Sequence, residues 1–298
     1  MSIFALINLI VLSIIFSFTF MPPANPWLGI NWSHTIAPCD WGYPVNVRGC
    51  LLPFGSPHYV AAIHKSHPSS GLTFDYFPEP YFGDINSNVY CLNMNPGGLD
   101  PAFTRSNDSM GTLESYMQGI LNHNITDSGY NGCIYDAGKP IFIDVALRDQ
   151  ILNSWFSKHK TGKGFCALNP RPHVGTSWLR EKSNSMFGAL GRNPNLFFIE
   201  YFPYHSNKGF PFPNYLPSYD YRNWLIEQAM NNGKTIIILR QERRWYSIPG
   251  IGSRLSTYSN KYVLKCPAGA WLTIKNICKG SRGTALTSRE WNSLLSML

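Results

Sequence analysis

The chain has 298 residues, enough for one large domain with a full core or for two small ones. Only 14% of the residues are charged while 14% are aromatic, and this composition excludes a disordered chain. The 25 Gly and 22 Pro indicate a loop-rich globular protein. The net charge of +8 favours an anionic partner, nucleic acid first, although many basic proteins bind none.

The first twenty residues carry no charge and are long enough to span a bilayer or to act as a signal sequence. The first basic residue is Arg48, however, so the basic flank of a signal peptide and a positive-inside signal are both missing. We therefore expect an over-extended start with Met21 as the true first residue, and a cytoplasmic protein. A membrane anchor or secretion is the alternative if residues 1–20 are genuine.

Seven cysteines are spread along the chain without a C-x-x-C pair. The odd count and the spacing argue against a zinc site or a disulfide framework and favour reduced thiols. The stretch "TGKG" (161–164) lacks the upstream Gly and the Lys-Ser/Thr order of a phosphate-binding loop. We therefore expect neither a metal nor a nucleotide cofactor.

Residues 21–76 are rich in Pro, Gly and aromatic residues and predict an irregular lead-in. Four short apolar runs then predict buried strands at residues 88–95, 195–202, 234–240 and 261–266. Helices are predicted at residues 109–123, 144–158, 176–190, 218–232 and 286–298, the last with a Thr287/Glu290 capping box. This alternation predicts an α/β sandwich with a short, mostly parallel, four-stranded central sheet.

The segment "LNMNPGGLDP" (92–101) leaves the first predicted strand, and parallel sheets bind ligands at the carboxyl ends of their strands. Pro96 and the following glycines force a tight turn, in which the backbone of Gly97 can approach a ligand closely. Asn95 at the strand end can hold a water or the edge of a base. An ordinary strand-exit turn is the alternative.

Several of these motifs resemble the uracil-DNA glycosylase superfamily. "MNPG" (94–97) is similar to its motif A in the form of the single-strand-selective and mismatch-specific branches, and residues 77–98 resemble the lead-in of bacterial members. "IEYFPY" (199–204) falls where the family reads the flipped base, and "CPAG" (266–269) resembles its second motif. The resemblance covers about residues 77–298.

The resemblance implies a three-layer α/β/α fold and a monomeric DNA glycosylase that needs no cofactor. Asn95 would position the attacking water, while Gly97 and Tyr201 would contact the flipped base. At the His or Asn position of the second motif this chain has Cys266, so no catalytic histidine is assigned there.

In the base-reading strand, Glu200 stands at the usual Asn of the family. An ionised carboxylate only accepts hydrogen bonds, so it suits the amino group of cytosine and repels the O4 of uracil. This predicts a modified cytosine as substrate. The alternative is that Glu200 pairs with a nearby Arg or Lys as part of the fold.

Three further residues are candidates for the site. His205 can donate a hydrogen bond to the departing base, or it is a surface histidine in a turn. Asp100 is a second candidate for activating water, or it is a solvated turn aspartate. Phe103 can stack on a flipped base, or it packs in the core.

Basic and aromatic residues also follow the third and fourth predicted strands. Arg240, Arg243 and Arg244 surround Trp245 and fit a DNA-backbone track, with a solvated basic face as the alternative. Trp271 stands where the family inserts a wedge into the duplex, although a sheet-facing strand explains "WLTIKNI" equally well.

Together these observations predict a monofunctional DNA glycosylase that flips a modified cytosine and hydrolyses its N-glycosidic bond, leaving an abasic site. Phage DNA with modified bases would be one setting, as an antiviral defence. A uracil-DNA repair glycosylase is one alternative. A non-catalytic nucleic-acid-binding module on the same fold is the other, because Cys266 replaces a catalytic position of some branches.

Overall fold

The computed structural model describes residues 23–27, 36–74, 78, 80–83, 85–95, 185–186, 188–190, 194–206, 210–267, 270–280 and 283–298. Residues 1–20 and the predicted helices at 109–123 and 144–158 lie outside this set. Among the described residues, no helix combines the length and the apolar character needed to cross a membrane.

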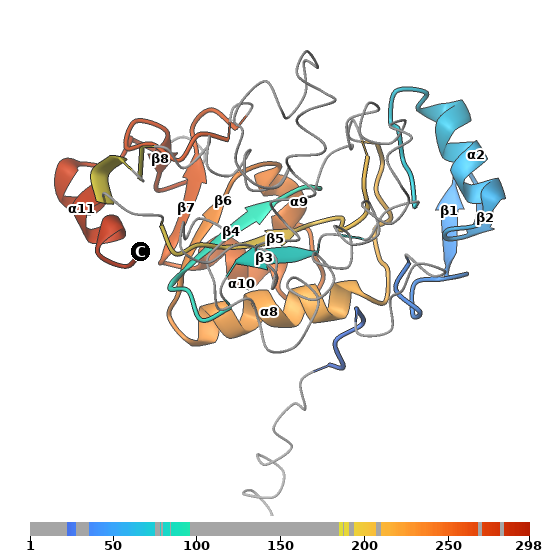
Figure 1. The fold of residues 1–298 in the computed structure, drawn as a ribbon, viewed down its shortest axis with the longest axis horizontal. Helices are drawn as coiled ribbons and strands as arrows, with labels where there is room; N and C mark the ends of the chain where they lie inside the picture. The colour runs from blue at the N-terminus through green and yellow to red at the C-terminus, as the bar shows by residue number, and fades with distance from the viewer. Residues whose placement is uncertain are drawn as a thin grey trace, which may run out of the picture.

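A six-stranded sheet forms the centre of the described chain (Figure 1). Its strands are β3 (Tyr81–Gly83), β4 (Val89–Asn93), β5 (Phe197–Glu200), β6 (Thr235–Ile238), β7 (Lys261–Leu264) and β8 (Ile277–Cys278), in the order β3-β5-β4-β6-β7-β8. The four predicted runs all form strands and pair in parallel, as expected. The sheet is wider than the predicted four strands, because β3 and β8 add antiparallel edges that are only three and two residues long.

The strand order places a topological switch point beside β4. The chain goes from β4 to β5 on one side, and then crosses to β6 on the other side and continues to β7. Connections leaving β4 and β6 therefore run in opposite directions, and such a divergence opens a ligand-binding crevice at the carboxyl ends of the strands. Asn93, Asn95 and Arg240 are at or just beyond these two ends.

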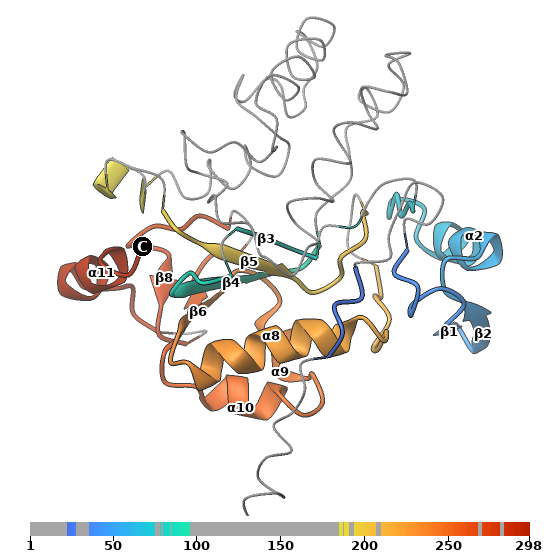
Figure 2. The ribbon, with the colours of Figure 1, turned by 60° about the horizontal axis from the view of Figure 1, so that its bottom comes forward.

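Three helices cover one face of this sheet: α8 (Tyr219–Asn231), α9 (Glu242–Tyr246) and α10 (Gly252–Thr257), as Figure 2 shows. The long helix α8 confirms the prediction at residues 218–232. Tyr81 and Phe197 turn their rings toward this layer, and the ring of Tyr81 contacts that of Tyr221 in α8. The described structure is thus a mixed α/β fold around a mostly parallel sheet.

The C-terminal helix α11 (Ser288–Leu295) confirms the predicted capping box. Thr287 Oγ1 accepts from the Glu290 backbone N–H at 3.3 Å, and Glu290 Oε2 accepts from the Thr287 N–H at 2.9 Å. The helix buries Leu294 against the core.

We expect Thr287→Ala to lower the free energy of unfolding by about 1 kcal/mol, because the change removes one side-chain cap and leaves a helix-end N–H without its partner. Urea denaturation measures the effect. Thr284→Ala, an exposed change three residues upstream, is the matched control and should have little effect. Equal stability of the two variants would show that the cap does not stabilise α11.

The lead-in is more regular than predicted. Instead of irregular structure, residues 44–66 hold an antiparallel hairpin, β1 (Pro44–Val47) and β2 (Cys50–Pro53), followed by helix α2 (Pro57–Ser66). The hairpin turns at Arg48 and Gly49, which both have positive φ, as a tight two-residue hairpin turn requires. α2 begins with Ser56 as N-cap, accepting from Tyr59 N at 3.1 Å, and with Pro at its first position.

This lead-in packs against the carboxyl-end side of the sheet. The buried ring of Phe54 contacts Tyr59 within the lead-in, and also Phe202 and Tyr204, which follow β5. The backbone adds a bond from Thr73 N to His205 O at 3.2 Å. Residues 36–74 therefore shape the segment that leaves the predicted base-reading strand.

Candidate functional site

A buried carboxyl group lies at the carboxyl end of β5. Glu200 is only 3% exposed, and its register partner on β4 is Asn93, which is 4% exposed. Asn93 Nδ2 donates to Glu200 Oε1 at 2.9 Å. Among the described residues, Glu200 Oε2 and Asn93 Oδ1 are buried without a hydrogen-bond partner. Buried polar atoms are costly when unpaired, so these two oxygens are the atoms of the pair that can take further hydrogen bonds.

The protonation of Glu200 follows from this burial. Burial raises the pKa of Glu200 from its ordinary 4.5 to about 8, although the hydrogen bond from Asn93 and the charge of Arg240 both act to lower it. The carboxyl group is therefore mostly neutral at pH 7, whereas the sequence predicts an ionised acceptor. A neutral carboxyl donates through one oxygen and accepts through the other.

The alternative for Glu200 is an ion pair within the fold. The described residues do not form one. Its hydrogen-bond partner is the amide of Asn93, and within this part of the chain it makes no salt bridge. Arg240 influences it only through its charge. Glu200 is thus a buried acid at a strand end, with one hydrogen bond from Asn93 and no ion pair among the described residues.

Asn95 lies two residues beyond Asn93, with its amide held in one orientation. Its Nδ2 donates to Ser206 O at 2.9 Å and to Ser206 Oγ at 3.0 Å. Strand-like pairing continues past the ends of β4 and β5, since Tyr201 N donates to Asn93 O at 3.1 Å. Side chains alternate along extended chain, so Asn93 and Asn95 lie on one face of the sheet together with Glu200. The Nδ2 contacts leave Asn95 Oδ1 as the atom that can accept from a water.

The segment after β5 is held by a buried aspartate of the lead-in. Asp40 is fully buried and accepts from Tyr204 Oη at 2.7 Å, from Ser218 N at 2.8 Å and from Ser218 Oγ at 2.6 Å. Tyr204 directly precedes His205 and Ser206, so Asp40 fixes the backbone that anchors Asn95. His205 is 2% exposed, which excludes the surface-turn alternative for it.

Tyr201 has a packing role in this structure. Its ring contacts Tyr219 of α8 and Trp245 of α9, with centroids 5.8 and 5.1 Å apart, and the guanidinium groups of Arg222 and Arg244 lie 4.5 and 5.4 Å from its centre. Arg222 Nη1 also donates to the backbone carbonyl of Tyr201. These contacts place the Tyr201 ring on the helical side of the sheet, opposite Glu200. Its predicted contact with a base is therefore not supported by this geometry.

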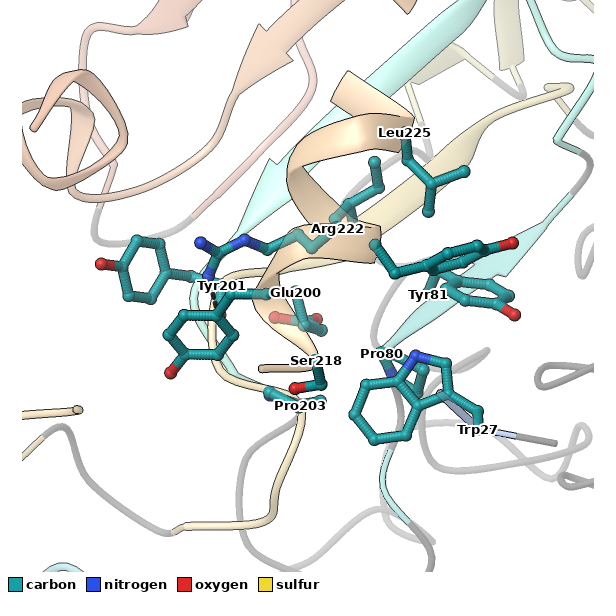
Figure 3. Close-up of a pocket in the computed structure, with 12 residues that line it drawn as sticks. Trp27, Pro80, Tyr81, Glu200, Tyr201, Pro203, Ser218, Arg222 and Leu225 are labelled. Atoms are coloured by element: carbon teal, nitrogen blue, oxygen red, sulfur yellow. Dashed lines mark hydrogen bonds between the residues drawn. The ribbon is translucent and has the colours of Figure 1, made fainter. Parts of the chain in front are cut away.

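A small pocket lies where β5 meets α8, and in the view of Figure 3 Glu200 stands between Tyr201 and Tyr81. Arg222 and Ser218 from the start of α8 also contribute to its wall. The space leaves room for no more than about one water molecule. This pocket is too small for a nucleobase, and the side chains of Asn93 and Asn95 lie on the opposite face of the sheet.

The predicted DNA-contacting arginines lie beyond the end of β6. Arg240 is half-buried directly after the strand, and Arg243 is exposed on α9. Arg244 is half-buried and lies over the rings of Tyr201 and Phe212, at 5.4 and 5.1 Å. Arg240 thus places a charge near Glu200, and Arg243 is an exposed cation. Arg244 is a cation packed on aromatic rings.

Trp271 is exposed, at 41%, while the neighbouring Leu272 is fully buried. The sheet-facing strand considered for this stretch does not form there, since β8 covers only Ile277–Cys278. Asn276 braces the loop: its Oδ1 accepts from Cys266 N at 2.6 Å, and its Nδ2 donates to Trp271 O at 2.8 Å. Trp271 is therefore an exposed side chain on a loop that Asn276 holds in place.

Three predicted site residues, Gly97, Asp100 and Phe103, lie outside the described residues, so their roles stay predictions. In the part of the chain that is described, no group of three or more His, Cys, Asp or Glu side chains gathers in a way that could hold a metal ion. Sequence reasoning missed Asn93, Ser206 and Asp40. Asn93 had one available signal, since it is a second polar residue near the end of an apolar strand.

Comparisons with protein-family models, with curated proteins and with solved structures find no match to this chain.

Proposed function

We propose that this chain is a monofunctional DNA glycosylase, built on a three-layer α/β/α sandwich, that flips a modified cytosine out of DNA and hydrolyses its N-glycosidic bond. Asn95 would orient the attacking water, and Glu200 would contact the amino group of the base. The products would be the free base and an abasic site.

One observation carries the proposal: a buried acid with an unpartnered oxygen, Glu200 Oε2, lies on the same face of the sheet as the fixed amide of Asn95. Parallel sheets bind ligands at this end of their strands, beside the switch point. An enzyme that excises a base needs both a group that reads the base and a group that holds a water. Glu200 and Asn95 supply these two functions from adjacent strands.

The surroundings suit DNA. Arg243 is exposed and can contact phosphates, and Arg240 and Arg244 add charge at the same end of the sheet. Trp271 is exposed on a loop braced by Asn276, where it can fill the gap that a flipped base leaves in the stack. The net charge of +8 agrees with such a partner.

The test is a panel of oligonucleotides that carry uracil, cytosine, hydroxymethylcytosine or glucosylated hydroxymethylcytosine. Abasic sites are detected as strand breaks after alkali. We expect breaks at a modified cytosine, and we expect Asn95→Ala to reduce their rate at least about 100-fold, because the water loses its positioning group. Asn292→Ala, an exposed change on α11, is the matched control and should retain full activity.

The other results are equally informative. Breaks at uracil in preference to every cytosine would favour a repair glycosylase. DNA binding without breaks on any substrate would favour a non-catalytic module. Equal rates for Asn95→Ala and Asn292→Ala would remove Asn95 from the mechanism.

A further inference from the structure

The two carboxyl oxygens of Glu200 have different surroundings. Oε1 accepts from Asn93 Nδ2 at 2.9 Å, whereas Oε2 has no hydrogen-bond partner among the described residues. In a neutral carboxyl group, the oxygen that accepts from an amide is best suited to be the carbonyl oxygen, which leaves the proton on the other one. Asn93 therefore assigns the acceptor role to Oε1 and the donor role to Oε2.

This pattern matches one edge of cytosine. The base presents an amino donor at N4 and an acceptor at the ring nitrogen N3. With N4–H facing Oε1 and N3 facing the Oε2 hydroxyl, both hydrogen bonds form. Uracil in the same position would set O4 against Oε1 and N3–H against the Oε2 proton, so both contacts would be repulsive. An ionised Glu200 would instead place an acceptor against the lone pair of N3.

We propose that Glu200 is the general acid of the proposed reaction, passing the proton on Oε2 to N3 of the flipped cytosine as the base leaves. This inference rests on the proposed function. It goes beyond base recognition, because the group that reads the base also takes part in breaking its bond to the sugar.

The C1′–N1 bond breaks and its electron pair goes to the base, while the Glu200 proton forms the N3–H bond, so the base departs as neutral cytosine. The water held by Asn95 forms the new C1′–O bond and releases a proton to solvent. Glu200, now ionised, takes a proton back from solvent before the next turnover. Water is the only co-reactant.

The proton matters because cytosine is a poor leaving group as an anion. General acid catalysis by a positioned side chain typically contributes about 10²- to 10⁴-fold to a rate. A carboxyl group with an ordinary pKa would have lost its proton at pH 7, but burial raises the pKa of Glu200 to about 8. The acid form is thus available at neutral pH.

Other ionisable and charged side chains lie around this group. Arg240, after β6, lowers the pKa of Glu200 through its charge. Tyr81 of β3 and Tyr219 and Arg222 of α8 line the pocket beside β5, on the helical side. His205 follows Glu200 on the same segment. Burial raises the pKa of Tyr219 well above its ordinary value of 10, so it does not titrate near pH 8.

The experiment measures single-turnover excision of the best modified cytosine from pH 6 to pH 10, with wild type and Glu200→Gln. Glutamine keeps the pattern of the neutral acid, accepting from N4 and donating to N3, but it has no proton to transfer. We expect wild type to lose rate above about pH 8, by about tenfold per pH unit. We expect Glu200→Gln to bind the substrate oligonucleotide within about threefold of wild type, to react at least about 100-fold more slowly, and to lack this alkaline decline.

The outcomes separate the two proposals. No excision of any base by wild type would overturn the proposed function. Excision by wild type with Glu200→Gln within threefold of its rate would overturn only the general-acid role. A wild-type rate that stays constant from pH 7 to pH 10 would overturn that role as well. The thermal midpoint of Glu200→Gln at pH 7, measured beside wild type, establishes that a slow variant is folded.

Discussion

Replacement of Asp40 by alanine is expected to lower the free energy of unfolding by about 3–5 kcal/mol. Asp40 is fully buried, and its carboxyl oxygens accept from Ser218 N, Ser218 Oγ and Tyr204 Oη at 2.6 to 2.8 Å. Alanine would leave these three buried donors without their acceptor. Each buried donor that loses its partner costs about 1–3 kcal/mol.

Asp220→Ala is the matched control. Asp220 is exposed and accepts from Tyr215 Oη at 2.8 Å, so its removal should cost less than about 1 kcal/mol. Urea denaturation of both variants at pH 7 gives the comparison. Similar stability of the two would show that the Asp40 network does not hold the lead-in to the sheet.

The same change should weaken the site. Tyr204, which Asp40 holds, precedes Ser206, and Ser206 fixes the amide of Asn95 through two hydrogen bonds. At a temperature where Asp40→Ala is still folded, we therefore expect its excision rate to fall more than that of Asp220→Ala. The lead-in thus belongs to the architecture of the site.

The parallel strands could be predicted from sequence because each forms a short, mainly apolar run between turn signals. β4, β5 and β6 are buried along their whole length, and β7 is buried in its second half. β3 and β8 could not, since strands of three and two residues leave no periodic pattern to detect. The lead-in was mispredicted for another reason. Its abundance of Gly and Pro concealed a local signal, Ser56 followed by Pro57, which marks the start of α2.

In the candidate site, too, one residue could be found from the sequence and its partners could not. Glu200 stood out because a carboxylate within an apolar run demands a physical explanation. Its partner Asn93 is 107 residues away in the chain, and Asp40 is 164 residues from Tyr204. Such contacts depend on strand register and on the packing of distant segments, which no local pattern encodes. The protonation of Glu200 depends on the same burial: the sequence predicts an ionised carboxylate, whereas burial raises the pKa of this group to about 8.

Glu200→Gln is expected to make the protein more stable at high pH, whatever reaction it catalyses. The pKa of Glu200 is about 8 in the folded protein and 4.5 as its ordinary value. The folded state therefore holds this proton more tightly than the unfolded state does, and the free energy of unfolding falls as the pH rises from about 4.5 to about 8. The full loss is on the order of 5 kcal/mol, because each pKa unit corresponds to about 1.4 kcal/mol.

Glutamine does not titrate, so Glu200→Gln should lack this part of the pH dependence and should exceed wild type in stability by several kcal/mol at pH 8.5. Urea denaturation at pH 5 and pH 8.5 measures the difference. Glu227→Gln on α8 is the control: this residue is exposed and pairs with Arg254 at 3.2 Å, so its change should leave the pH dependence nearly as in wild type.

Parallel pH curves for wild type and Glu200→Gln would mean that Glu200 is already ionised in the folded protein at neutral pH. In that case Oε2 would carry no proton to give to a base, and Glu200 could only accept from the cytosine amino group. A curve that is steep for wild type and flat for Glu200→Gln would instead establish a buried proton at the end of β5. The stability measurement therefore tests the acid form of Glu200 without any substrate, and the excision assay then tests whether that proton is used.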